Sequence, residues 1–509
     1  MSISNRMIIN KLNFGRFSGF SFALCFATHT VSAQKPNVLL VISDDQSYPH
    51  ASAYGSKMVS TPAFDYVAKK GALFTNAYVC SPGSSPSRAA LLTGLYPWQL
   101  EEAGTHASSF SAKYACYPEI LKDNGYFIGY TGKGWAPGNW RISGRPHNPA
   151  GPEYNNLKLQ PPYTGLSKND YTANFKKFLS ERPQGAPFCF WFGAQEPHRD
   201  FEEGSWRKEG YSLTKAEVPA FLPDTEVIRG DILDYAVEIE WFDKHLMNCI
   251  EELRRIGELD NTIIIVTADN GMAFPRAKAN CYDDGIHVPL AICWGNNIKG
   301  NQVIDALVST IHIAPTIFDA TGVSINHLLS GTSMLPLMQG KKKEYRVEAV
   351  FAGRERHSYS RYNNLGYPTR AIRWSNYLLI RNFKPYLYPA GDPKLINERG
   401  DFEDAYYDID DCPSKTFLIE NSADNDVKPY FVAAVAKRYE FELFDLKKDR
   451  SCMNNVADDK KYAKILAKME KMLIDKLVET NDSRIGSNPE IWETYPRLEG
   501  KTRKFPKNH

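Results

Sequence analysis

Four short apolar runs, separated by much longer segments, set the main constraint on how this chain of 509 residues folds. The runs cover residues 38–42, 126–130, 188–192 and 262–266. Each has the length and composition of a buried strand, and helical patterns lie between them. Strands that alternate with helices are typical of an α/β fold in which helices cover both faces of one sheet.

A long amphipathic helix is predicted between the last two runs, over residues 224–256. Apolar residues recur there every three or four positions, from Ile228 to Ile256, and form one face that suits packing on the sheet. Gly257 follows and is placed to end the helix. We interpret this helix as scaffold.

The pattern changes beyond residue 345. Aromatic, alternating segments at 369–383 and 441–445 predict a small antiparallel sheet. Residues 462–477 predict an amphipathic helix that closes the chain.

Polar and charged residues stand just after all four runs. Asp44 and Asp45 follow the first run, Lys133 the second, His198 the third, and Asp269 with Asn270 the fourth. Open α/β sheets bind ligands at the carboxyl edge of their strands, so we expect these side chains to converge there. The two aspartate-containing pairs offer only oxygen ligands, which suit a hard divalent cation, calcium before magnesium. Either pair alone is common turn chemistry.

The stretch from Ser84 to Gly94, SSPSRAALLTG, has the pattern of a reactive centre on a helix start. Pro86 suits the first helical positions, and the alanines and leucines propagate the helix. Ser84 then lies where free backbone N–H groups and the helix dipole favour an anion, at an exposed helix start. Arg88 lies one turn later on the same face, where its guanidinium can hold an oxyanion by two hydrogen bonds.

This motif resembles the signature of the formylglycine-dependent sulfatases, a family of the alkaline phosphatase superfamily. The resemblance covers nearly the whole chain after residue 33. Within the family, segments 196–199, 270–275 and 366–370 are similar to those of the sulfamidase-like branch. The resemblance implies an α/β fold with a large mixed, mostly parallel sheet sandwiched by helices. It also implies a catalytic domain over 34–345 and, over 346–509, a smaller C-terminal α+β subdomain with a short antiparallel sheet that contributes to the substrate pocket.

The same resemblance assigns roles to individual residues. Ser84 would be oxidised to formylglycine (3-oxoalanine) by a radical-SAM sulfatase-maturating enzyme, and the hydrated aldehyde would attack sulfur and then expel sulfate. One Ca²⁺ per chain would be held by Asp44, Asp45, Ser84, Asp269 and Asn270. Sulfate charge would be stabilised by Arg88, Lys133 and Lys278, and His198 would act as an acid or as a sulfate ligand.

The sequence departs from the family pattern at Trp135. The family has a Gly-Lys-x-His element, and Lys133 matches its lysine, but Trp135 stands where the histidine is expected. That histidine helps the nucleophile to turn over. Its role in this chain is therefore unfilled or is taken by another residue.

Basic residues dominate the segment 354–384, where Glu355 is the single acid and aromatic residues are interleaved. Arginines for anions and aromatics for ring faces suit a sulfated or uronate-bearing sugar. An equally good interpretation is a set of structural or solvent-facing arginines. Arg354 and His357 open the segment nearest to the expected pocket, and we predict that they bind substrate.

The N-terminus has the pattern of a secretory signal peptide over residues 1–33. Three basic residues precede an apolar stretch at 17–27, and Val31-Ser32-Ala33 fits a cleavage site. We therefore expect export, to the periplasm or out of the cell. No other apolar run is long enough to span a bilayer.

The charge argues against a nucleic-acid-binding protein, and the cysteines argue against a fold held by disulfides. Without residues 1–33 the chain has 58 basic and 59 acidic side chains, so no global positive field argues for nucleic acid. Eight of the nine cysteines lie beyond that segment, none forms a CxxC pair, and several lie in apolar runs, which favours buried free thiols. Cys412 and Cys452 are the pair to examine first for a disulfide.

These inferences together predict a secreted bacterial carbohydrate sulfatase. Its substrate would be a sulfated oligo- or polysaccharide, either an algal polysaccharide such as ulvan or a glycosaminoglycan. The alternatives are an N-sulfoglucosamine sulfohydrolase (sulfamidase) proper, a phosphonate or phosphodiester hydrolase of the same superfamily, and an inactive glycan-binding relative.

Overall fold

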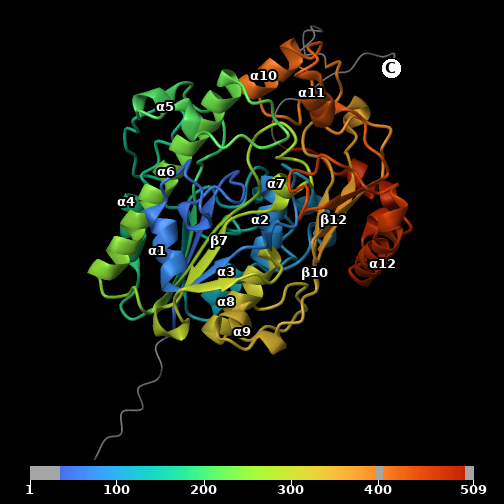
Figure 1. Ribbon diagram of the computed structural model, residues 1–509. Helices are drawn as coiled ribbons and strands as arrows, with labels where there is room; N and C mark the ends of the chain where they lie inside the picture. Colours follow the sequence, from blue (N-terminus) through green and yellow to red (C-terminus); the bar gives the residue numbers. More distant parts are fainter. Residues whose placement is uncertain (1–34, 396–404, 499–509) are drawn as a thin grey trace, which may run out of the picture. The chain divides into compact units, whose positions relative to one another are not determined.

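A seven-stranded sheet forms the centre of the computed structural model, which describes residues 35–395 and 405–498 (Figure 1). Its strand order is β4 (Phe127–Gly132), β5 (Phe188–Gly193), β1 (Asn37–Ser43), β6 (Thr262–Ala268), β7 (Leu290–Cys293), β2 (Ala72–Phe74) and β8 (Gln302–Ile304). The first four strands are parallel, β7 is antiparallel to both of its neighbours, and β2 and β8 are parallel. The mixed, mostly parallel sheet and the four predicted strands are thus confirmed.

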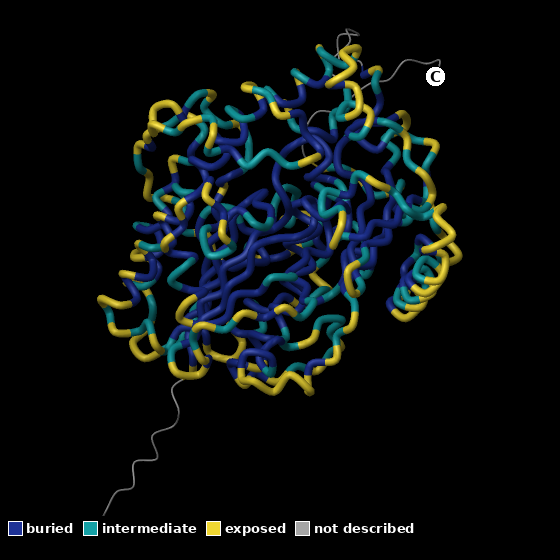
Figure 2. Tube along the Cα trace, in the orientation of Figure 1, coloured by how far each residue is buried: buried dark blue, intermediate teal, exposed yellow. Residues whose placement is uncertain are grey.

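Helices cover both faces of this sheet, because side chains of a strand point alternately to opposite sides. In β1, Val38 and Leu40 face one hydrophobic core, and Leu39 and Val41 face another. The first core contains residues of α2 (Ser84–Thr93), α3 (Tyr117–Asp123) and α8 (Ile313–Thr321). The second contains residues of α1 (Pro62–Lys70), α4 (Tyr171–Glu181) and α6 (Glu226–Arg255). Figure 2 shows the strands as the most deeply buried part of the molecule.

The predicted long helix corresponds to α6, which is 30 residues long. Thr225 caps its start, since its side chain accepts a hydrogen bond from the backbone N–H of Ile228. Gly257 lies just beyond its end with a left-handed backbone (φ 74°), as predicted for a helix stop.

A second, four-stranded antiparallel sheet follows, in the order β10 (Ala349–Arg354), β11 (Thr369–Trp374), β12 (Tyr377–Asn382) and β13 (Phe441–Asp445). One of its faces packs against α12 (Ala463–Glu479), as Figure 1 shows, through Met469, Leu473 and Leu477. The other face packs against residues that border the large sheet, including Tyr78 and Ala268. The predicted small sheet and closing helix are confirmed.

Short elements complete the described chain. They are β3 (Ala77–Tyr78), β9 (Val308–Ser309), α5 (Ser205–Lys208), α7 (Asp283–Ile286), α9 (Leu335–Met338), α10 (Pro413–Glu420) and α11 (Lys428–Val435). Residues on both sides of the expected boundary at 345 belong to one compact unit that begins at Lys35. The predicted signal peptide, residues 1–33, lies outside the described residues. Across 35–395 and 405–498, no helix combines the length and the apolar character needed to cross a membrane.

The cysteines of the described chain are buried thiols. All eight are free, including Cys412 and Cys452, so the disulfide considered for that pair is not formed. Burial without a charged partner raises the pKa of Cys189, for example, well above its usual value. The prediction of buried free thiols is confirmed.

Candidate active site at the carboxyl edge of the sheet

The ends of β1 and β6 bring the four predicted oxygen ligands together. The two strands stay in register to their last residues, so Asp44-Asp45 and Asp269-Asn270 leave the sheet side by side. The backbone N–H of Asp45 donates to Asp269 Oδ1 at 3.1 Å, and the Asn270 amide donates to Asp45 Oδ1 at 2.6 Å. Asp45 turns the chain there with a left-handed backbone (φ 70°), which aspartate adopts more readily than most residues.

The hydroxyl of Ser84 lies at the centre of this cluster. Ser84 Oγ is 3.1 Å from Asp44 Oδ1, 3.4 Å from Asn270 Oδ1 and 3.2 Å from Lys133 Nζ. As the first residue of α2, Ser84 has a backbone N–H with no partner inside the helix. The expected exposure is wrong, because Ser84 is only 1% exposed and all residues of α2 are buried.

Arg88 donates hydrogen bonds to a carboxylate of the cluster and to two nearby backbone carbonyls. Its Nε donates to Asp269 Oδ2 at 2.8 Å, and one guanidinium nitrogen donates to the carbonyls of Lys133 and Gly134 at 2.6 and 3.1 Å. The other terminal nitrogen is 3.5 Å from Asp44 Oδ1 and makes no hydrogen bond among the described residues. Arg88 therefore cannot offer sulfate the two parallel hydrogen bonds expected from the sequence, and it positions the carboxylates.

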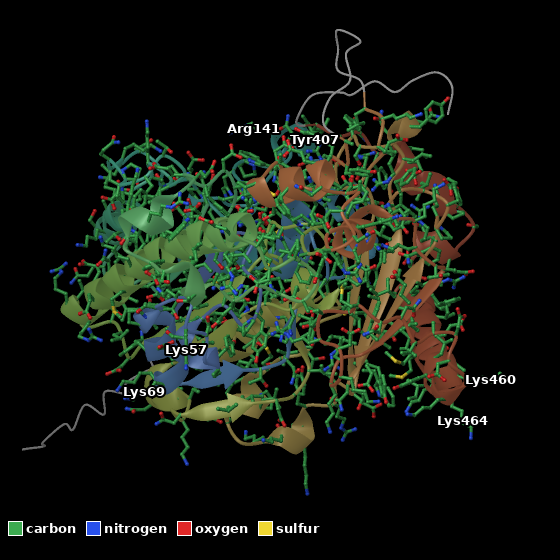
Figure 3. The ribbon with its side chains drawn as sticks, turned by 45° about the horizontal axis from the view of Figure 1, so that its top comes forward. Lys57, Lys69, Arg141, Tyr407, Lys460 and Lys464 are labelled. Carbon is green, nitrogen blue, oxygen red and sulfur yellow. The ribbon has the colours of Figure 1, made fainter. Side chains whose placement is uncertain are left out.

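Two lysines contact different aspartates of the cluster. Lys133 Nζ is 2.6 Å from Asp44 Oδ2, and Lys278 Nζ is 2.7 Å from Asp45 Oδ2. Lys278 is also 2.8 Å from Asp410, a carboxylate that the sequence analysis missed. Both site lysines are largely buried, whereas Lys460 and Lys464, labelled in Figure 3, project from the periphery.

For Asp44 and Lys278, neighbouring opposite charges together shift the pKa more than burial does. Burial raises the pKa of Asp44, but Lys133 and Arg88 hold that pKa well below its usual range. Burial lowers the pKa of Lys278, but its two carboxylate partners raise that pKa above its usual value. Asp44 is therefore an anion and Lys278 a cation at neutral pH.

The donor set fits a hard divalent cation. One carboxylate oxygen from each of Asp44, Asp45 and Asp269 lies within 4.8 Å of the other two, and all three residues are buried. Burial and the neighbouring Asp44 raise the pKa of Asp269, as expected for crowded carboxylates. With Asp410, four carboxylates face three cationic side chains, so the formal charge is negative and a divalent ion would reverse it. Oxygen-only ligands of this charge suit Ca²⁺.

His198 lies at the rim of the site. Its Nε2 is 3.8 Å from Asp45 Oδ2, and its side chain is 38% exposed. Its Nδ1 is hydrogen-bonded to the carbonyl of Arg199, and because a carbonyl only accepts, Nδ1 carries the proton. The Nε2 atom lies on the side of the cluster, where an imidazole nitrogen can accept a proton or, once protonated, donate one.

Comparison with protein families shows which family this chain belongs to. A family model described as Sulfatase matches residues 36–323, which is more than half of the chain. This chain belongs to the sulfatase family. Members of the family hydrolyse sulfuric esters and generally use Ca²⁺ and formylglycine. A second model, described as N-sulphoglucosamine sulphohydrolase, C-terminal, matches residues 276–388 of this sulfatase.

Known relatives span most of this sulfatase. N-sulphoglucosamine sulphohydrolase of Homo sapiens is 27% identical over 498 residues, covering 90% of this chain and 93% of that protein. An ulvan-active sulfatase of Formosa agariphila is 24% identical over 506 residues, covering 88% and 75%. A solved structure in complex with its substrate, D-glucosamine-2-N,6-O-disulfate, is similar with a TM-score of 0.64 at 18% identity, covering 90% of this chain and 99% of that one. The last comparison establishes a shared fold.

Trp135 supports helix α2 of this sulfatase. Its side chain is buried, and its indole N–H donates to the carbonyl of Ser85 at 3.0 Å. It also packs against Phe110, with ring centroids 5.2 Å apart. An indole N–H is only a donor, so Trp135 does not replace the family histidine.

Two histidines flank the start of α2. The rings of His106 and His357 stack with centroids 4.3 Å apart. They border Gly83, where an added Cβ would lie 3.2 Å from His357 Nδ1 and 3.8 Å from the His106 ring. Burial lowers the pKa of His357 to about 3, so its imidazole is neutral. His357 thus lies beside the start of α2, and its contact with substrate stays a prediction. His106 was not predicted.

The basic segment after β10 is largely structural. Arg354 is buried, contacts the carboxylate of Asp408 and donates to the carbonyl of Pro389 at 3.0 Å. Arg361 binds the same Asp408 carboxylate at 2.6 Å, and Arg370 is held by two other buried acids. Arg354 and Arg361 share the single negative charge of Asp408, so these pairs leave the substrate contact of Arg354 a prediction.

Proposed function

We propose that this sulfatase is exported and removes sulfate from a sulfated oligo- or polysaccharide. The observation that carries the proposal is the hydroxyl of Ser84, buried between Asp44, Asn270 and Lys133 at the start of a helix. The names of the human and Formosa relatives, which refer to N-sulphoglucosamine and to ulvan, support a carbohydrate substrate.

The cluster would hold one Ca²⁺ through Asp44, Asp45, Asp269, Asn270 and Ser84. Ser84 would first be converted to formylglycine by a radical-SAM sulfatase-maturating enzyme. With both groups present, the ion would lower the pKa of the attacking hydroxyl, and the hydrated aldehyde would offer a second hydroxyl for sulfate release.

The remaining residues of the site would bind charge and move protons. Lys133 and Lys278 would stabilise the sulfate oxygens, since both ammonium groups lie beside the cluster and both side chains are at most 14% exposed. Arg88 would keep Asp269 in place. His198, exposed at the rim with Nε2 toward the cluster, would donate a proton to the leaving oxygen or nitrogen of the sugar.

N-sulfoglucosamine is a second candidate substrate within the same proposal. A model of the C-terminal part of N-sulphoglucosamine sulphohydrolases matches residues 276–388, which include Lys278 and His357. Cleavage of an N-sulfate needs the same sulfuryl acceptor, and its leaving group is a nitrogen that His198 could protonate.

The test uses protein co-expressed with a radical-SAM maturase. Mass spectrometry of the Ser84 peptide should show loss of two hydrogens, and ion chromatography should detect sulfate released from a panel of O- and N-sulfated saccharides. The same protein is assayed on phosphate and phosphonate esters. Faster turnover of those esters would favour the phosphonate or phosphodiester hydrolase, and an unmodified Ser84 in the presence of the maturase would favour the inactive glycan-binding relative.

A further inference from the structure

Asp410 places an additional carboxylate beside Lys278, at the edge of the candidate active site. Its Oδ2 is 2.8 Å from Lys278 Nζ, and ligand atoms of Asp45, His198 and Asp410 all lie within 4.8 Å of one another. The side chain of Asp410 is 29% exposed, whereas those of Asp44, Asp45 and Asp269 are at most 2% exposed. Among these four carboxylates, Asp410 is therefore the one that solvent reaches most easily.

The fold holds this carboxylate in a fixed place. Asp410 follows Asp408, which is buried and bound by the guanidinium groups of Arg354 and Arg361. Between them, Ile409 packs in an apolar core, and its carbonyl accepts a hydrogen bond from Lys415. Tyr407, on the same segment, is labelled at the upper edge of Figure 3. The buried arginines thus serve the pocket indirectly, by anchoring the segment that carries Asp410.

The chemistry of Asp410 differs from that of the groups around it. The proposed sulfate position lies among Lys133, Lys278 and His198, which attract an anion. An ionised carboxylate only accepts hydrogen bonds, and a second anion beside it is repelled. A neutral or cationic donor on the sugar, a hydroxyl or an ammonium group, is the partner that Asp410 can bind.

We propose that Asp410 determines specificity: it selects a sugar that carries a free hydroxyl or amine beside the sulfated position and rejects one that carries a second sulfate or a carboxylate there. This inference rests on the proposed carbohydrate sulfatase function. It deepens that function by naming the substitution pattern of the preferred substrate.

The test compares Asp410→Asn with Asp411→Asn in fully matured protein. Asp411 is the matched control, because it is the next residue, its side chain is 58% exposed, and it pairs with Lys415. The probes are defined monosulfated hexosamines, their disulfated counterparts with a second sulfate on a neighbouring position, and 4-nitrophenyl sulfate, which has no sugar hydroxyl. For each probe kcat/KM is measured by sulfate release.

Wild-type protein and Asp411→Asn should both prefer the monosulfated sugar. Asp410→Asn should lower kcat/KM for that sugar by about 10- to 100-fold, the usual effect of losing a hydrogen bond to a charged group, and should narrow or reverse the preference over the disulfated sugar. Loss by the same factor on all three probes would overturn the proposal, because Asp410 would then act only by holding Lys278.

Failure of the proposed function has a different signature. In that case wild-type protein releases no sulfate from any probe, and calorimetric binding of the same sugars to the Ser84→Ala variant, with and without Asp410→Asn, replaces the rate measurement. A preference for monosulfated sugar that Asp410→Asn removes would support the specificity role. Equal affinities for the two sugars in both proteins would overturn it.

Discussion

Replacing Arg88 with lysine keeps the positive charge of this buried side chain but removes the planar guanidinium group, which donates hydrogen bonds in several directions. Arg88 is fully buried and donates to Asp269 and to the carbonyls of Lys133 and Gly134 at 2.6–3.1 Å. A single ammonium group cannot reach the Asp269 carboxylate and both carbonyls. The Lys133 carbonyl also accepts from the indole N–H of Trp191 at 2.9 Å, so at least one buried acceptor, the Gly134 carbonyl or the Asp269 carboxylate, loses its donor. Such a loss costs about 1–3 kcal/mol, and we expect Arg88→Lys to lower the free energy of unfolding by about that amount.

Urea unfolding followed by circular dichroism measures this difference, read as a shift of the midpoint at constant slope. Arg229→Lys is the control, because Arg229 pairs with Asp224 at the surface and the change should matter little. Sulfatase activity of matured Arg88→Lys should also fall, since the displaced Asp269 is a proposed ligand. A loss below about 1 kcal/mol together with normal activity would refute the positioning role of Arg88.

Three further outcomes are expected. Ser84→Ala should abolish turnover and leave the melting temperature nearly unchanged; a near-normal rate would remove Ser84 as the nucleophile. Ca²⁺ at 100 times its Kd should raise the free energy of unfolding by about 2.7 kcal/mol, and chelation should reverse this gain. Asp269→Asn should abolish the gain. A calcium effect that persists in that variant would show that the ion binds elsewhere. Burial lowers the pKa of His312 from its usual value to about 3 in the folded state, so the protein should lose stability as the pH falls below about 6.5, by about 2 kcal/mol at pH 5 from this residue alone. Urea unfolding at both pH values should show a smaller loss for His312→Asn, and an identical loss would contradict the assignment.

The features that could be predicted are those marked by a pattern in consecutive residues. A strand covered by helices on both faces is apolar along most of its length, and β1 and β6 each contain an unbroken run of apolar residues, 38–42 and 263–266. The polar residues directly after those runs mark the carboxyl edge of the sheet. Asp44, Asp45, Asp269 and Asn270 could therefore be placed together from the sequence alone.

The unpredicted features depend on contacts between distant parts of the chain. Lys278 and Asp410 are 132 positions apart, and the acidic run around Asp410 has the local pattern of a solvated loop. Arg354 pairs with Asp408, 54 positions away, so its sequence neighbours do not reveal this contact. The burial of Ser84 has the same origin: α2 is enclosed partly by the C-terminal sheet, where Ala90 shares a core with Ile372.

The enclosure of α2 bears on the order of folding and of the proposed modification of Ser84. All ten residues of this helix, Ser84 among them, are buried. A modifying enzyme would need access to the Ser84 side chain, and the folded chain leaves only 1% of Ser84 exposed. The proposed modification would therefore precede closure of the C-terminal sheet over the helix, and a chain that folded first would keep serine at this position.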